Sequence, residues 1–202
     1  MTRFAAVALV CLVLFGCHAK PEPTTSPTAI VGETPKAKAP DDAKSHFNSG
    51  TKKLDEGDKL GAILDYDEAI RQDPKEPMFY INRGVAKAAL GDRLGAIADY
   101  DTAIRLDRQE PSAYYNRGNA KLARGDRAGA IADFDESIRL DPSNAEAHYN
   151  KACAFAKAKD GPKAASCLKK AIAISLSMRE DAKKDPDFDP VRNHPDFQAL
   201  MK

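Results

Sequence analysis

The sequence lacks the residue patterns on which most enzymes depend. It contains no glycine-rich loop between a strand and a helix, which would hold phosphates, and no nucleophile elbow. Its four histidines are not spaced as metal ligands, and no acid–base pair stands out. We therefore expect no enzymatic activity, no metal site, no cofactor and no small-molecule substrate.

Charge of one sign and membrane-length apolar runs are also scarce. Lys and Arg number 31 against 30 Asp and Glu, and no basic stretch stands out, so we expect no nucleic-acid partner. The apolar run Phe4–Phe15 would span about 18 Å as a helix, against about 30 Å for a bilayer core. It follows the basic Arg3 and is typical of a signal peptide.

What the sequence does contain is a repeat of 34 residues. Residues 77–110 include INRGVAKAALGDRLGAIADYDTAIRLD, and residues 111–144 include YNRGNAKLARGDRAGAIADFDESIRLD. Copies in the same phase occupy residues 43–76 and 145–176. Positions below are counted from the first residue of each copy. Position 8 holds Gly or Ala, position 20 holds Ala, position 24 is aromatic in three copies, and proline recurs near position 32.

This pattern resembles the tetratricopeptide repeat (TPR). The usual tryptophan at position 4 is absent, and His46, Tyr80, Tyr114 and His148 stand there instead. The resemblance implies an all-α solenoid of four helix–turn–helix repeats. Residues 177–202 no longer follow the period, and their prolines and apolar residues predict a C-terminal cap over the last repeat.

Several landmarks indicate how each repeat folds. Gly50, Gly84, Gly118 and Ala152 at position 8 would let the two helices approach closely. Gly-Asp pairs at the expected turns would combine a left-handed glycine with an aspartate that caps the next helix. These turns are Gly57-Asp58, Gly91-Asp92, Gly125-Asp126 and, in reverse order, Asp160-Gly161.

The first 42 residues predict export and anchoring. The end of the apolar run, Leu14 to Cys17, resembles the lipobox of bacterial lipoproteins, which implies cleavage after residue 16 and lipid attachment at Cys17. Ordinary cleavage after Ala19 and an uncleaved start are the alternatives. Residues 17–42 are rich in proline and read as a disordered tether. His18 rather than aspartate after the cysteine implies the outer membrane, facing the periplasm, if the cell is Gram-negative.

An asparagine recurs at position 6 of every repeat. This position lies about 160° from position 8 around a helix, so it faces away from the packed interior, toward the concave groove of the fold. The pattern resembles the asparagine ladder of the glycosyltransferase that adds GlcNAc to Ser and Thr, which implies binding of a peptide main chain. Bridging between neighbouring first helices, or simple inheritance with the repeat, is the alternative. The predicted groove residues are Asn48, Asn82, Asn116, Asn150, Phe47, Tyr115, Asn119 and Tyr149.

Two further patterns concern charge and cysteine. Acids at position 23 and cations at position 7 predict ion pairs between repeats, 18 residues apart in sequence: Asp65 with Arg83, Asp99 with Arg117, and Asp133 with Lys151. Cys153 would face the groove and would therefore point away from the second helix of the repeat, which carries Cys167. Two separate thiols are therefore favoured over a disulfide, although export would permit one.

Together these features predict a membrane-tethered adaptor that binds a peptide or protein partner in its groove, in assembly or maintenance of the cell envelope. The alternative is a self-assembling structural lipoprotein, in which the groove takes the C-terminal segment of a neighbouring copy.

Overall fold

The computed structural model describes residues 40–202. The predicted signal peptide, the lipid site Cys17 and most of the predicted tether therefore lie outside the described residues. Within residues 40–202 no helix is both long and apolar enough to cross a membrane. This part of the chain is helical throughout and contains no strand, which confirms the predicted all-α class.

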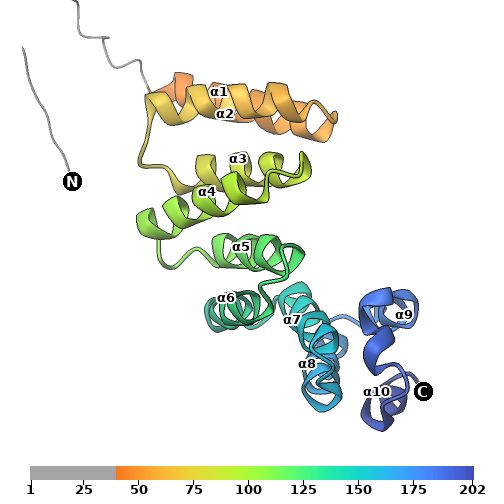
Figure 1. Ribbon diagram of the computed structural model, residues 1–202. Coiled ribbons are helices and arrows are strands. Elements are labelled where there is room, and N and C mark those ends of the chain that lie inside the picture. The colour runs from red at the N-terminus through yellow and green to blue at the C-terminus, as the bar shows by residue number, and fades with distance from the viewer. Residues whose placement is uncertain (1–39) are drawn as a thin grey trace, which may run out of the picture. The chain divides into compact units, whose positions relative to one another are not determined.

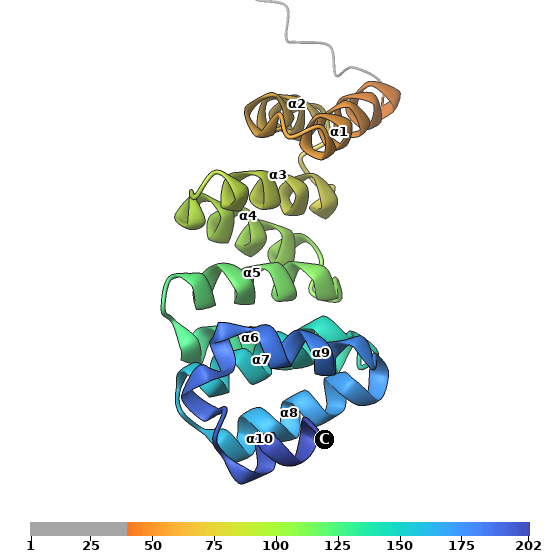
Figure 2. The same ribbon diagram turned by 90° about the vertical axis from the view of Figure 1, so that its right-hand side faces the viewer.

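Eight helices form four antiparallel pairs that stack in chain order (Figures 1 and 2). The second helix of each pair packs against the first helix of the next. The pairs are α1 (Pro40–Asp55) with α2 (Lys59–Gln72), α3 (Pro77–Ala89) with α4 (Arg93–Leu106), α5 (Pro111–Ala123) with α6 (Arg127–Leu140), and α7 (Ala145–Lys157) with α8 (Gly161–Ile174). Helix α1 begins at Pro40, within the predicted tether, and proline suits a first helical turn.

The turns inside the first three repeats have the predicted chemistry. Gly57, Gly91 and Gly125 have φ angles of 88°, 89° and 87°. The following aspartate accepts a hydrogen bond from the backbone N–H three residues on, as in Asp92 with Gly95 at 2.9 Å. In the fourth repeat Lys159, with φ of 60°, takes the left-handed position, and Gly161 is the first residue of α8.

The core of each repeat depends on the close approach at position 8. A Cβ atom built on Gly84 would lie 2.6 Å from the ring of Tyr100, and one on Gly118 would lie 2.7 Å from the ring of Phe134. Both rings are buried. Glycine is therefore required opposite an aromatic residue, which confirms the predicted helix contact.

The C-terminal segment covers the last repeat. It consists of α9 (Ser177–Lys184), the 3₁₀ helix η1 (Pro186–Val191) and α10 (Pro195–Leu200). Phe188 and Phe197 are buried, and η1 lies against α7 while α10 lies against α8. The chain leaves α8 at an extended Ser175, so α9 is a separate helix and not a continuation of α8.

The predicted ion pairs between repeats are wrong in their acidic partners. Arg83 binds Asp99 of its own repeat and Asp67 of the preceding one, both at 2.5 Å. Asp65 instead binds Lys53 at 2.8 Å and Ser49 at 2.6 Å.

The following repeats correct the other two pairs in the same way. Arg117 binds Asp133 and Asp101, both at 2.6 Å, and Lys151 binds Asp135. Positions 23 and 25 differ by about 200° around a helix. The acid at position 23 therefore faces its own first helix, and the acid at position 25 faces the next repeat.

Candidate functional site

Three hollows follow the first helices of the repeats. The first hollow, of about 400 Å³, lies between α1 and α3, and the middle hollow, of about 260 Å³, lies between α3, α4 and α5. The last hollow, of about 330 Å³, lies between α5, α7 and the chain leading into η1. The middle and last hollows share Asn119 and Ala123, so they lie next to each other. We call the three hollows together the groove.

The first hollow is mainly apolar. Its lining includes Phe47, Met78 and Phe79, with Asp73 and Glu76 among its polar residues. The Phe47 ring lies 5.2 Å from the ring of Phe79, centroid to centroid, and 5.8 Å from that of Tyr66. Phe47, a predicted groove residue, thus contributes to both the hollow and the contact between repeats.

The middle hollow is lined by Val85, small alanines and two of the predicted residues, Asn116 and Asn119. The Nδ2 of Asn116 donates to the carbonyl of Ser112 at 2.9 Å, and Asn82 makes the equivalent bond to Met78 at 2.9 Å. Within residues 40–202 no donor reaches the Oδ1 of either amide. Each oxygen is therefore available as a hydrogen-bond acceptor.

The remaining ladder asparagines are in different environments. Asn48 is exposed on α1. Asn150 donates to the Tyr115 hydroxyl at 3.1 Å and to the Oδ1 of Asn119 at 2.8 Å. Asn150 therefore ties α7 to α5, which is the bridging arrangement that the sequence left open as an alternative.

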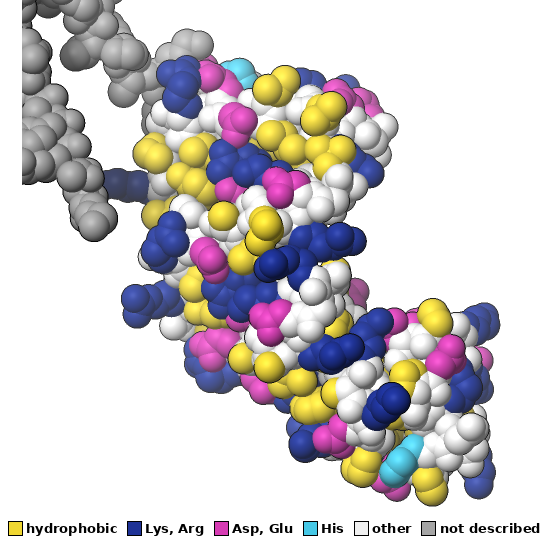
Figure 3. All heavy atoms as spheres, in the orientation of Figure 1, with side chains coloured by type: hydrophobic (Ala, Val, Ile, Leu, Met, Phe, Trp, Pro, Cys, Tyr) yellow, Lys and Arg dark blue, Asp and Glu magenta, His cyan; other side chains and the backbone are white. Residues whose placement is uncertain are grey.

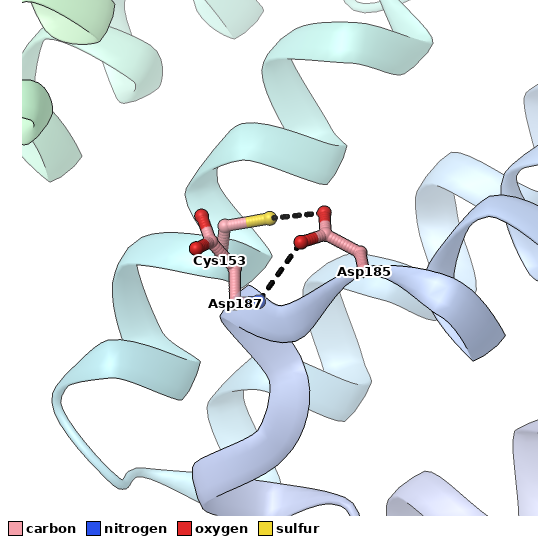
Figure 4. Close-up of side chains that lie close together, drawn as sticks. All are labelled: Cys153, Asp185 and Asp187. Carbon is pink, nitrogen blue, oxygen red and sulfur yellow. Dashed lines mark hydrogen bonds between the residues drawn. The ribbon is translucent and has the colours of Figure 1, made fainter.

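The last hollow ends against the C-terminal segment. Asp185 accepts hydrogen bonds from the Tyr149 hydroxyl at 2.9 Å and, weakly, from the Cys153 thiol at 3.8 Å. Asp187 pairs with Lys157. In Figure 4 Asp185 points at the sulfur of Cys153, with Asp187 beside it. These contacts fasten the C-terminal segment across the first helix of the last repeat.

The thiol and the two carboxylates approach one another closely enough to consider a cation. One ligand atom from each of Cys153, Asp185 and Asp187 lies within 4.8 Å of the others. Burial and the neighbouring Asp185 charge raise the pKa of the Cys153 thiol, so it stays protonated at neutral pH. Tyr149 and Lys157 already bind the carboxylates, and we assign the cluster a structural role.

The two cysteines of the repeats are free thiols, Cys153 buried and Cys167 half-buried. Burial also raises the pKa of Cys167. Neither thiol is therefore a nucleophile poised for reaction at neutral pH.

The eight predicted residues thus lie in three settings. Four of them line the groove, Phe47, Asn116, Asn119 and Asn150, while Asn48 and Asn82 lie on first helices outside the lining residues. Asn150 and Tyr115 bond to each other at the junction of α5 and α7, and Tyr149 is bonded to the C-terminal segment.

Sequence reasoning missed several lining residues: Phe79, Arg93, Asp185 and Asp187. Asp185 and Asp187 come from outside the repeats, where no periodicity applies.

The face of the stack drawn in Figure 3 carries no field of one sign. Figure 3 shows basic and acidic side chains interspersed down the stacked repeats. Asp67 and Asp101, the more exposed partners of Arg83 and Arg117, contribute acidic groups to the surface of the stack. Burial lowers the pKa of Arg117, but its bonds to Asp133 and Asp101 outweigh that effect and raise the pKa overall.

Comparison with known proteins identifies the type of repeat. Family models for the tetratricopeptide repeat match residues 115–176 and residues 88–125. No curated protein matches the chain.

Solved structures share the architecture. One MamA structure has a TM-score of 0.67 at 21% identity, over 81% of this chain and 86% of that one. YrrB, described as a TPR protein with an unusual peptide-binding site, has a TM-score of 0.62 at 22% identity, over 71% of this chain and 75% of that one. The first TPR domain of Spaghetti (RPAP3), bound to the HSP90 peptide SRMEEVD, has a TM-score of 0.55 at 28% identity, over 56% of this chain and 90% of that one.

The fold is therefore a TPR solenoid, as the repeat pattern predicted. The repeat models match residues 88–176 of this solenoid.

Proposed function

We propose that this chain is an adaptor whose groove holds an extended peptide segment of a partner protein. The observation that supports this most directly is the matched pair Asn82 and Asn116. Each amide is fixed by its own helix, and each leaves its Oδ1 without a donor among residues 40–202. An amide oxygen held in this way can accept a main-chain N–H of any peptide sequence.

Two of the similar structures support the same reading. The RPAP3 domain is bound to a peptide, and YrrB is described as having a peptide-binding site. Asn48 would extend the row toward the N-terminus. Asn150 would not, because its amide is used between α5 and α7.

The proposal places the adaptor on a membrane. The lipobox-like sequence ending at Cys17 would supply the lipid, and the proline-rich residues 17–42 would hold the repeats away from the bilayer. The same resemblance to lipoproteins implies a role in the cell envelope and, if the cell is Gram-negative, location at the outer membrane, facing the periplasm.

The competing function, self-assembly through the C-terminal segment, has less support. That segment already packs on the last repeat of its own chain, with Phe188 and Phe197 buried. Sedimentation of the full-length protein separates the two functions, because self-assembly requires oligomers that grow with concentration and without a partner.

The test is capture of envelope proteins by the full-length protein and by its Asn82→Ala/Asn116→Ala variant. Two lost hydrogen bonds predict roughly ten-fold weaker binding, at about 1 kcal/mol or less for each bond. Asn193→Ala is the matched control, because Asn193 is exposed and outside the groove. A partner that binds the folded double variant as tightly as the wild type would rule out the asparagines as its site.

A further inference from the structure

The chemistry of the groove changes along its length. The middle hollow combines Val85, Tyr100 and alanines with two asparagines and the cation Arg93, and the last hollow ends at Asp185 and Asp187. Only the first hollow, among these three, combines aromatic and other large apolar side chains with carboxylates. A peptide along the groove therefore meets one hollow where a large apolar side chain and a neighbouring cation both find partners.

The apolar floor of the first hollow is formed by residues that differ from their counterparts in later repeats. Met78, at position 2, is 36% exposed, and the equivalent residues are Ser112 and Glu146. Phe79, at position 3, corresponds to Ala113 and Ala147. Phe79 is only 7% exposed, so Met78 is the part of the floor most open to a ligand.

The sides of the same hollow carry two acids and one base. Asp73 accepts a hydrogen bond from the backbone N–H of Lys75 at 3.1 Å, and Glu76 accepts one from that of Met78 at 3.2 Å. Each bond uses one carboxylate oxygen, so the second oxygen and the negative charge remain available to a cation of the ligand. Lys44 supplies the single cation among the lining residues. The charge around the apolar floor is therefore negative and complements a cation.

We propose that the first hollow is the specificity subsite of the groove, and that it takes a large apolar side chain next to a lysine or arginine of the partner. The apolar side chain covers Met78, Phe47 and Phe79, and the basic residue pairs with Asp73 or Glu76. The neighbouring main chain runs on toward Asn82 and Asn116. This inference rests on the proposed peptide-binding function and adds to it the composition of the bound segment.

The experiment measures binding of three fluorescent peptides to the full-length protein by anisotropy. The peptides share a Ser-Ala background and differ in a central Leu-Lys, Leu-Glu or Ser-Lys pair. Leu-Lys is expected to bind about ten-fold or more tightly than Ser-Lys, since one apolar side chain is buried. It is expected to bind about five-fold more tightly than Leu-Glu, with a difference that falls as salt is added.

Two variants assign these effects to the hollow. Met78→Glu places a charge on the apolar floor and should abolish the preference for leucine. Leu94→Glu is its matched control, because Leu94 is also the exposed second residue of a helix, at 64% exposure, and lies outside the lining. Glu76→Gln, combined with Asp73→Asn, removes the charge while keeping both oxygen acceptors, and should abolish only the preference for lysine.

Equal binding of Leu-Lys to the wild type and to Met78→Glu would overturn the proposal, as would equal binding of all three peptides. Equal binding of Leu-Lys and Leu-Glu would overturn the role of the acids. If the peptides show none of these differences in binding while capture of the partner still depends on Asn82 and Asn116, the proposed subsite is ruled out and the adaptor function stands. If the partner binds the Asn82→Ala/Asn116→Ala variant as tightly as the wild type, the proposed adaptor function itself is ruled out.

Discussion

Repeats 2 and 3 and repeat 4 occupy neighbouring places in one stack, yet they hold their two helices together differently. In repeats 2 and 3 a glycine faces an aromatic ring, and a buried aspartate binds an arginine and a lysine of the first helix. In repeat 4 Ala152 stands in place of the glycine, Leu168 in place of the aromatic residue, and Cys167 in place of the aspartate. The cation Lys151 binds only Asp135 of the preceding repeat.

The comparison shows that these positions are coupled in pairs. A larger residue at position 8 accompanies a smaller one at position 24, so the space between the helices stays filled. Loss of the buried acid at position 23 accompanies replacement of arginine by lysine at position 7. The repeat therefore tolerates change in its core when both members of a pair change together.

The largest effect is expected on removing the buried acid of repeat 3. Asp133→Ala should lower the free energy of unfolding by about 3 kcal/mol, because Arg117 and Lys121 lose their buried partner. Asp135→Ala on the same helix is the control and should cost less than about 1 kcal/mol, because this carboxylate is 55% exposed. Urea unfolding followed by circular dichroism measures both, and equal losses would contradict the distinction.

A smaller effect is expected from filling the glycine position of repeat 3. Gly118→Ala places a methyl group 2.7 Å from the Phe134 ring and should cost about 2 kcal/mol. Phe134→Leu alone should cost about 1 kcal/mol. The double variant reproduces the pairing of Ala152 with Leu168 and should cost about 1 kcal/mol less than the sum. Strict additivity in a double-mutant cycle would show that the two positions are independent.

The smallest effect is expected on the pH dependence of stability, through His148 at position 4 of the fourth repeat. Burial lowers the pKa of His148 below its ordinary value of 6.5, although its bond to the Pro142 carbonyl acts in the opposite sense. The unfolded chain therefore binds the proton first, and stability is lost as pH falls below about 6.5. Tyr80 and Tyr114 bond the carbonyl six residues back in the same way. His148→Tyr should therefore lose less stability than the wild type between neutral pH and about pH 5.

For each protein the urea midpoint is measured at neutral pH and at about pH 5. The difference between these two midpoints, compared between wild type and His148→Tyr, checks this prediction. An unchanged pH dependence in His148→Tyr would assign the acid sensitivity to other groups.

Local features of the fold could be predicted from the sequence because they depend on local chemistry. The left-handed glycines at 57, 91 and 125 and their aspartate caps are determined by a few consecutive residues. The Gly–aromatic contact recurs at a fixed offset of 16 residues, as in Gly84 with Tyr100, so the period itself indicates it.

Contacts that depend on side-chain direction could not be predicted as well. Asp65 and Asp67 are both candidates for Arg83, and the spacing alone favoured the wrong one. The orientation of α2 against α3 decides between them. Likewise, four identical asparagines gave no sign that Asn150 would bond to Tyr115 and Asn119.

The C-terminal segment shows the clearest limit. Its apolar residues predicted a cap, and Phe188, Val191 and Phe197 are indeed buried. That Asp185 would reach Tyr149 could not be predicted, because the contact joins residues 36 apart with no repeat relation.

Each position-7 arginine also has a consequence for the relation between successive repeats. Arg117 holds Asp101 on α4 and Asp133 on α6 with one rigid, planar group. The rotation of repeat 3 against repeat 2 is thereby fixed from a place that lines none of the three hollows. Replacing this one arginine would therefore alter the width of the groove, while every residue that lines the three hollows stays the same.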